Sequence, residues 1–174
     1  MNLLAERHPT DPGVLAAMLL NRVALRPGQA VFLDAGNMHA YLSGAGIEIM
    51  ANSDNVLRGG LTSKHVDVDE LTTVLDFHPI PGDTLAPEPV SDGVVRYPSP
   101  ATEFALWRLT PSGSTVEVPE TDAGRALIVV EGSVKLSSDG VDLTVGQGQA
   151  AFLEAGTAAT ATGSGTAFLA GPGV

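Results

Sequence analysis

The chain has 174 residues, of which 44% are hydrophobic and 17% charged, so a globular fold is expected rather than disorder. The formal net charge of −11 argues against nucleic acid or an anionic membrane surface as partner, because both require clustered Lys and Arg. Cysteine is absent, which excludes a disulfide framework and thiol chemistry. The N-terminus lacks a signal-peptide core and no apolar run approaches the ~20 residues of a membrane helix, so a soluble cytoplasmic protein is expected.

The first third of the chain predicts one helix followed by short strands. Thr10-Asp11-Pro12-Gly13 combines a capping residue with proline in the first turn, which is typical of a helix start. Apolar residues follow at helical spacing from Val14 to Leu19, and Arg26-Pro27-Gly28 signals a turn before which the helix should end. Short apolar runs then predict three strands, at 29–33, 40–42 and 47–50.

A second helix and a linker are predicted next. Asp67-Val68-Asp69-Glu70 resembles a capping box, and Leu71, Val74 and Leu75 form one apolar helical face after it. Between Pro79 and Pro100 the chain carries six of its twelve prolines, which predicts an extended linker.

The remainder of the chain predicts only strands. The candidate strands lie at 104–109, 115–118, 126–136, 141–145, 149–153 and 166–170. Asp139-Gly140 between two of them is a strong hairpin signal. Twenty glycines and many short Val, Leu and Ala runs agree with a turn-rich β protein.

An internal repeat is the most informative feature of the sequence. The nine residues from Gly28 to Gly36 recur from Gly148 to Gly156, with seven of nine positions identical and Asp34 replaced by Glu154. Convergence of two turn-strand-turn units in an Ala- and Gly-rich chain is the plain alternative. The density of identity favours two related β modules 120 positions apart.

The first copy continues to His39 and resembles the second sequence motif of cupins, which are small jelly-roll barrels. The usual Pro of that motif is Asp34 here, and its terminal Asn is Ser43. In cupins this strand delivers a His into the barrel, where the imidazole can hold a divalent metal. The second copy carries Ala159 in place of His39, so a metal-free second module is expected.

From Leu25 to Phe77 a closer resemblance appears. The runs Pro27 to Leu33, Gly36 to Leu42 and Gly46 to Val68 look like the signature region of the type I, zinc-dependent mannose-6-phosphate isomerases. The resemblance is close over about a third of the chain and loose over the rest. It implies an aldose-ketose isomerase that interconverts mannose 6-phosphate and fructose 6-phosphate by moving a proton between C1 and C2, with a zinc ion organising the site.

The resemblance also implies roles for single residues. His39 would be the last zinc ligand of the family, and Arg58 the active-site arginine near the reacting carbons. Polar positions that line the family's pocket match Tyr41, Glu48, Asp54 and Lys64. A guanidinium can stabilise a developing enediolate without titrating, Lys64 would add positive potential for an anionic substrate, and either carboxylate could carry a proton or orient a hydroxyl.

Each of these residues also has a structural reading. His39 could be an ordinary surface histidine, Arg58 a solvated turn residue beside two glycines, and Tyr41 a packed ring. Glu48 alternates with isoleucines, which is typical of an outward face, Asp54 lies among turn formers, and Lys64 could simply solvate a loop. The sequence alone does not identify the proton-transferring group.

The chain departs from the family in its metal ligands. The family's zinc site uses Gln, His, Glu and His, of which only the last is identifiable, as His39. Upstream of Gly28 the only candidates are Glu6 and His8, and neither lies in a matching motif. A single His does not hold zinc where protein sites use three or four ligands, so the chain is expected to be a C-terminal portion with little activity alone. A missing N-terminal segment or a partner chain would supply the rest.

These patterns together predict a mainly β protein of cupin-type jelly-roll barrels, an incomplete first barrel plus a C-terminal barrel, with two short helices. We expect residues 1–78 to form the C-terminal half of a catalytic cupin module, 79–100 a Pro-rich linker, and 101–174 a metal-free cupin module. The alternative functions are a non-enzymatic cupin module that binds a sugar or stabilises an oligomer, and a generic metal cupin such as an oxygenase. The latter would need a His-x-His motif, which the chain lacks.

Overall fold

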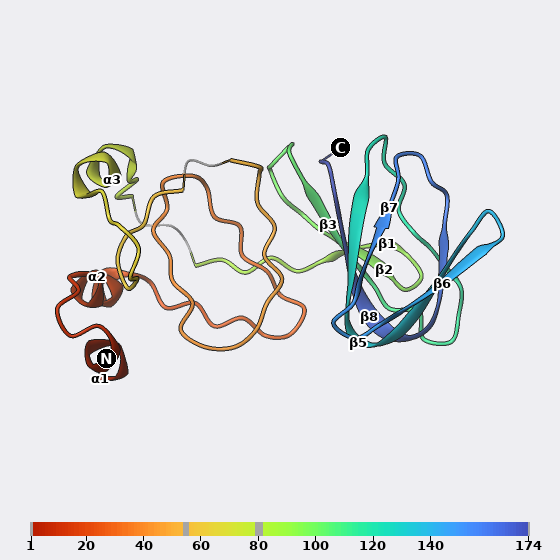
Figure 1. Cartoon of the computed structure of the whole chain (residues 1–174), viewed down its shortest axis with the longest axis horizontal. Helices are drawn as coiled ribbons and strands as arrows, with labels where there is room; N and C mark the ends of the chain where they lie inside the picture. The colour runs from red at the N-terminus through yellow and green to blue at the C-terminus, as the bar shows by residue number, and fades with distance from the viewer. Residues whose placement is uncertain (1, 54–55, 79–81, 174) are drawn as a thin grey trace. The chain divides into compact units, whose positions relative to one another are not determined.

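The computed structural model describes residues 2–53, 56–78 and 82–173, which divide into two compact units. The first unit comprises Met1–Arg26, Val31–Gly46 and Asn52–Thr84, and the second comprises Pro27–Ala30, Ile47–Ala51 and Leu85–Val174. Figure 1 shows that the helices belong to the first unit and the strands to the second.

Three short helices form in the first unit, one more than the sequence predicts. They are α1 (Asn2–Arg7), α2 (Gly13–Leu19) and α3 (Val68–Val74). The predicted start of α2 is confirmed, but the helix ends at Leu19, well before the turn at Pro27, because Leu20 is extended. Leu19 is 87% exposed, so the last turn gains little from packing, and a short helix needs packing to persist.

The capping of α3 agrees with its sequence. The Glu70 N–H donates to Asp67 Oδ1 at 3.1 Å, which satisfies one of the free donors at the helix start. At the other end the Leu75 N–H donates to the Leu71 carbonyl. The predicted capping residue and the helix of two turns that follows it are therefore confirmed, whereas the predicted apolar face is not formed, because Leu75 lies beyond the helix and Val74 is exposed.

The strands predicted at 29–33, 40–42 and 47–50 are not formed. Among these residues the structure contains one isolated antiparallel bridge, in which Ala30 exchanges two hydrogen bonds with Leu85. A strand requires a neighbour to take its N–H and C=O groups, and outside this bridge the described residues offer these segments no ladder. The three strand predictions are therefore wrong, while the incomplete first barrel stays a prediction.

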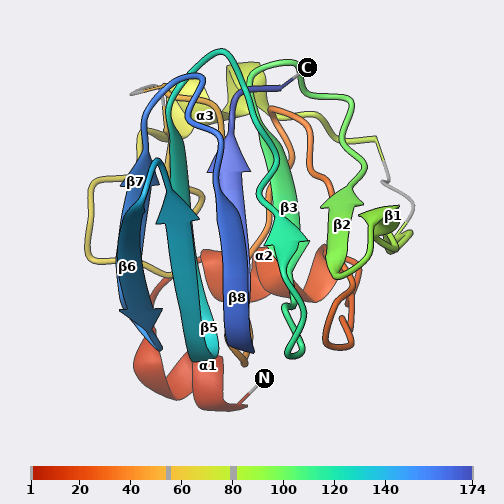
Figure 2. The same ribbon diagram turned by 90° about the vertical axis from the view of Figure 1, so that its right-hand side faces the viewer.

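The second unit is an antiparallel sheet of eight strands. The bounds are β1 (Glu88–Ser91), β2 (Val94–Tyr97), β3 (Ala105–Leu109), β4 (Val116–Glu117), β5 (Arg125–Ser138), β6 (Val141–Gly146), β7 (Ala150–Leu153) and β8 (Thr160–Gly171). Figure 2 shows the order β1-β2-β3-β8-β5-β6, while β4 pairs with β8 and β7 pairs with β5. The mainly β class is thus confirmed, and each of the six predicted C-terminal strands has a counterpart.

Two hairpins join neighbouring strands of the sheet, β5 to β6 and β1 to β2. Asp139 and Gly140 both have positive φ, 48° and 78°, which is the hairpin turn predicted between β5 and β6. Where an extended linker is predicted at 79–100, β1 and β2 form a hairpin that pairs with β3. Proline is tolerated there because β1 lies at the edge of the sheet. The proposed domain boundaries themselves stay a prediction.

The core of the second unit lies on one face of this sheet. Side chains that are almost fully buried include Leu109 on β3, Leu127 and Val129 on β5, and Ala167 and Leu169 on β8. Strand β5 has the alternating burial of a sheet with one covered face, which is the pattern its sequence predicts.

One charged residue, Arg125, is fully buried in the second unit. Its guanidinium donates to the carbonyls of Pro119 and Thr157 at 2.5 Å, and to that of Glu154 at 3.4 Å. Burial lowers the pKa of this guanidinium, and the charge of Glu120 opposes the shift. Arg125 thus ties the segment between β4 and β5 and the segment after β7 to the start of β5.

We expect Arg125→Met to lower the free energy of unfolding by about 3 kcal/mol, because it leaves two part-buried carbonyls without the donors that they have in the wild type. Urea unfolding followed by circular dichroism measures this loss. The matched control is Lys135→Met, which removes an ammonium paired with Asp142 at the surface and should cost less than about 1 kcal/mol. Equal losses in the two variants would contradict the role assigned to Arg125.

Candidate functional site

The two copies of the sequence repeat adopt the same turns. Gly28 and Gly148 have φ of 86° and 78°, and Gly36 and Gly156 have φ of 82° and 68°. In both copies the turn before the second glycine closes with a backbone hydrogen bond, Asn37 N–H to Asp34 at 3.3 Å and Thr157 N–H to Glu154 at 3.2 Å. Because glycine adopts positive φ without a Cβ clash, the repeated glycines encode a repeated backbone.

The second copy indicates where the chain leads after this turn. Ala159, the counterpart of His39, is 6% exposed and belongs to the core cluster of the second unit. The same turn in the first copy is followed by His39, which is exposed. In the described structure the two counterparts therefore differ in exposure.

His39 lies beside an aromatic neighbour. Its Nδ1 is 3.0 Å from the Asn37 carbonyl oxygen, within hydrogen-bonding distance. The ring of Tyr41 meets it edge to face, with 6.2 Å between centroids, and Tyr41 is 77% exposed. Two of the predicted site residues are thus neighbours on one segment.

Arg58 and Lys64 lie on one loop of the first unit, on either side of an unusual turn, and both are exposed. Gly60 has φ of 129° and Leu61 has φ of 55°, a left-handed conformation that is uncommon for a residue with a side chain. After the turn the Lys64 N–H donates to the Thr62 hydroxyl at 3.1 Å.

This turn is held by a residue distant in sequence, Asp11. Asp11 Oδ1 accepts from the Gly13 N–H at 2.7 Å, and Oδ2 accepts from the Leu61 N–H at 2.6 Å. The Gly13 N–H above all holds the pKa of Asp11 below its usual value, and the Leu61 and Thr62 N–H groups add to the effect. A depressed pKa means that the stabilisation is present above the ordinary pKa of 3.8 and is lost as pH falls through the lower folded value.

The segment of His39 and the loop of Arg58 touch through their neighbours. A Cβ placed on Gly59 would lie 3.1 Å from Met38 Cε, so the Met38 side chain packs directly on the Gly59 backbone. The fold therefore brings together two segments that carry His39 and Arg58, although they are about twenty residues apart in sequence.

The two predicted carboxylates lie outside the part of the first unit that the structure describes. Glu48 is exposed and belongs to the second unit, whereas His39, Tyr41, Arg58 and Lys64 belong to the first. Asp54 lies outside the described residues. The roles given to all six residues stay predictions.

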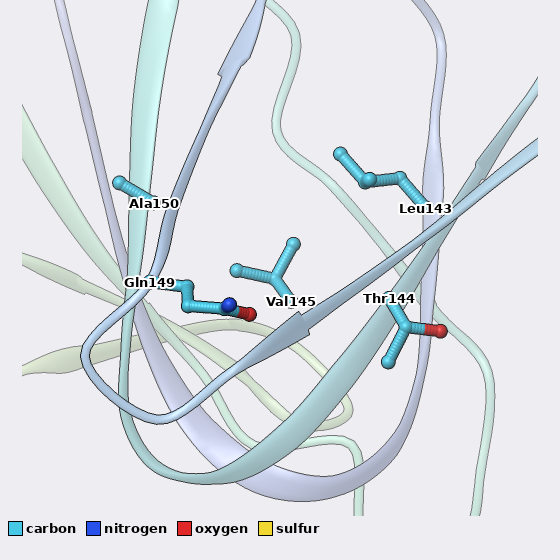
Figure 3. Close-up of a pocket in the computed structure, with 5 residues that line it drawn as sticks. All are labelled: Leu143, Thr144, Val145, Gln149 and Ala150. Atoms are coloured by element: carbon cyan, nitrogen blue, oxygen red, sulfur yellow. The ribbon is translucent and has the colours of Figure 1, made fainter.

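Two surface depressions are lined by residues other than the predicted site residues. One is lined by Leu143, Thr144, Val145, Gln149 and Ala150, and Figure 3 shows the Gln149 side chain reaching from its turn toward Val145. It offers no titratable group. The other lies along α1 and α2 and is lined by Ala5, His8, Pro9, Thr10, Asp11, Pro12, Val14 and Leu15.

The residues present do not by themselves fit a zinc ion. Within residues 2–53, 56–78 and 82–173, no group of three or more His, Cys, Asp or Glu side chains could hold a metal. His39 alone is one imidazole, and protein zinc sites use three or four ligands. The same residues contain no helix long and apolar enough to cross a membrane.

The eight-stranded antiparallel sheet and the repeated glycine turns define a mainly β protein with cupin-like structure. No protein-family model matches the sequence. Individual proteins do match its sequence, and all of those reported below are mannose-6-phosphate isomerases. The chain is homologous to part of the type I mannose-6-phosphate isomerases.

The sequence relatives come from bacteria, plants and animals. Identity is 39% over 160 residues to mannose-6-phosphate isomerase of Salmonella typhimurium, covering 89% of this chain and 40% of that protein. It is 38% over 156 residues for the Escherichia coli enzyme, with the same coverages. The enzyme of Bos taurus is 39% identical over 141 residues, covering 78% of this chain and 33% of its own.

Solved structures agree with these matches. A mutant of phosphomannose isomerase from Salmonella typhimurium has a TM-score of 0.88 at 35% identity, covering 99% of this chain and 45% of that one. The isomerase of the same organism bound to fructose 6-phosphate and zinc has a TM-score of 0.85 at 36% identity, covering 98% and 44%. The chain thus spans about 40% of the length of the relatives it matches.

Proposed function

We propose that this chain forms part of a mannose-6-phosphate isomerase, which interconverts mannose 6-phosphate and fructose 6-phosphate. The observation that carries the proposal is 39% identity over 160 residues to an enzyme of that activity. A relative of similar identity binds fructose 6-phosphate and zinc. The matched stretch is about 40% of such an enzyme, so the other parts of the site would come from outside it.

Within that site we assign separate tasks to the residues of the first unit. Arg58 and Lys64 give a locally positive surface to a chain with a net charge of −11, as an anionic sugar phosphate requires. Tyr41 lies beside His39 and offers a hydroxyl to the sugar. His39 provides one zinc ligand of a set completed by other residues, and Glu48 and Asp54 are candidates for proton transfer or hydroxyl orientation.

The proposed architecture is of cupin type, with a C-terminal jelly-roll module that lacks a metal and a first module completed by strands from elsewhere. The repeated turns support this arrangement, because they give His39 and the buried Ala159 equivalent positions. In the second module that position carries a methyl group, which cannot ligate a metal.

A graft tests the proposed function. The matched stretch of the Salmonella typhimurium isomerase is replaced by this chain, and turnover of mannose 6-phosphate is measured in a coupled assay. We expect the graft to be active, and the isolated chain to show no turnover and only weak zinc binding. A folded, zinc-loaded graft without turnover would refute the assignment.

The alternative is a non-enzymatic module that binds a sugar or stabilises an oligomer. It is favoured by one observation, that the described residues contain no group of three metal-ligating side chains. The DNA upstream of Met1 separates the two functions. An in-frame segment encoding Gln-x-His and a later Glu supports the isomerase, whereas a promoter immediately upstream supports the module.

A further inference from the structure

The contact between Asp11 and Leu61 joins residues that are fifty positions apart. The bond from the Gly13 N–H to Asp11 Oδ1 is local and would suffice to cap the start of α2. The second bond, at 2.6 Å from the Leu61 N–H to Oδ2, does nothing for α2. Its effect falls on the loop between Arg58 and Lys64.

The loop needs such a partner because its turn is strained. Leu61 has φ of 55°, which is unfavourable for a residue with a Cβ unless the surroundings hold it. At Gly60, with φ of 129°, a Cβ would lie 3.0 Å from Gly13 Cα and 2.9 Å from Asp11 Oδ1. The start of α2 and the turn therefore pack backbone against backbone, with the carboxylate bonded to both.

We infer that Asp11 is a positioning residue for the sugar-phosphate site, because its carboxylate fixes the Gly60–Leu61 turn from which Arg58 and Lys64 project. Arg58 precedes Leu61 by three residues and Lys64 follows it by three. Long cationic side chains lose rotamer freedom when they bind an anion, and a backbone fixed beforehand limits that cost. The inference rests on the proposed function.

Two-dimensional NMR of the graft, which carries the full 174-residue chain together with the other parts of the site, tests the inference with fructose 6-phosphate as the probe. In the wild type we expect the Leu61 amide to be protected from exchange, and the sugar phosphate to shift Arg58 and Lys64 resonances. Asp11→Ala should remove the protection and weaken binding about tenfold, as expected when two rotamer-rich side chains must be ordered at binding. Asp11→Asn keeps one acceptor oxygen and should restore both properties in part.

Asp83→Ala is the matched control, since Asp83 is an exposed aspartate elsewhere in the first unit. If the unmutated protein binds fructose 6-phosphate, and Asp11→Ala and Asp83→Ala bind it with equal affinity, the inference is refuted while the proposed function stands. Loss of Leu61 protection without loss of affinity would overturn it as well. An unmutated, zinc-loaded graft in which fructose 6-phosphate shifts neither Arg58 nor Lys64 would instead overturn the proposed roles of these two residues, and the inference with them.

A pair of glycine variants tests the same contact from the loop side. Gly60→Ala places a Cβ against Gly13 and Asp11, so it should weaken fructose 6-phosphate binding as Asp11→Ala does. Gly44→Ala is the matched control, because Gly44 also lies in the first unit with a positive φ, 103°, but a Cβ there meets nothing within 4 Å, so affinity should change less than about twofold. Similar losses in both variants would contradict a specific role for the Asp11 contact.

Discussion

His39→Ala in the graft should lower isomerase turnover at least about 100-fold, because loss of a metal ligand costs no less than loss of its supporting hydrogen bonds. Bound zinc, measured by atomic absorption on the dialysed protein, should fall in parallel. The physical reason is the repeated turn. His39 follows the first copy of this turn as Ala159 follows the second, and Ala159 lies in the core of the second unit. The imidazole is thereby expected inside a completed module.

His78→Ala is the control for this experiment. His78 is also exposed, with 92% of its side chain accessible, and its Nδ1 lies 2.6 Å from Asp76 Oδ1 after the end of α3. It has no place in the proposed site, so turnover and zinc content should match the unmutated graft. If His39→Ala retains full zinc and full turnover, His39 is not a ligand and the cupin reading of the first copy fails.

Gly132→Ala should prevent the second unit from folding, or lower its free energy of unfolding by more than about 4 kcal/mol. Gly132 lies in β5 beside a register shift, opposite Gly165 of β8, and has φ of 67°. A Cβ there would lie 2.2 Å from the Ser164 carbonyl oxygen and 2.9 Å from Gly165 Cα. Both are backbone atoms, so no side-chain rotation relieves the overlap and the central strand pair must separate.

Gly140→Ala is the control that separates the two effects expected in Gly132→Ala, the overlap of the new Cβ with backbone atoms and the strain of a positive φ. Gly140 also has positive φ, 78°, but a Cβ there meets nothing within 4 Å. We expect a loss of about 1 kcal/mol from the left-handed conformation alone. Urea unfolding and circular dichroism of both variants measure the difference, and equal stabilities would show that β5 and β8 do not approach as closely as the structure has them.

Local sequence patterns were sufficient to predict a turn, a helix start or a strand where the hydrogen-bond partner of each residue lies nearby in sequence. Asp139-Gly140 predicts its hairpin because two positive φ angles are a property of the turn itself. Asp67 predicts the start of α3 for the same reason, since its acceptor reaches only to Glu70. The alternating pattern of β5 also survives in the structure, because its covered face belongs to a complete sheet.

Predictions failed where a distant partner decides the outcome. The apolar run at 29–33 has the composition of a strand, but the structure gives it a single bridge, from Ala30 to Leu85. The prolines before Pro100 indicate a linker, yet β1 and β2 pair there because β3 offers an edge. The sequence around Asp11 predicts only a helix start, because no local pattern indicates its bond with Leu61, fifty residues away.

By itself the sequence determined the mainly β class, the repeated module, the likeness to mannose-6-phosphate isomerases and the residues that carry it, because these depend on residue type and spacing. Only the tertiary structure decided which segments become strands, that Arg125 is buried against carbonyls, and that Asp11 holds the turn between Arg58 and Lys64. Those features depend on hydrogen-bond partners tens of residues away, whose approach is set by the packing of the whole unit.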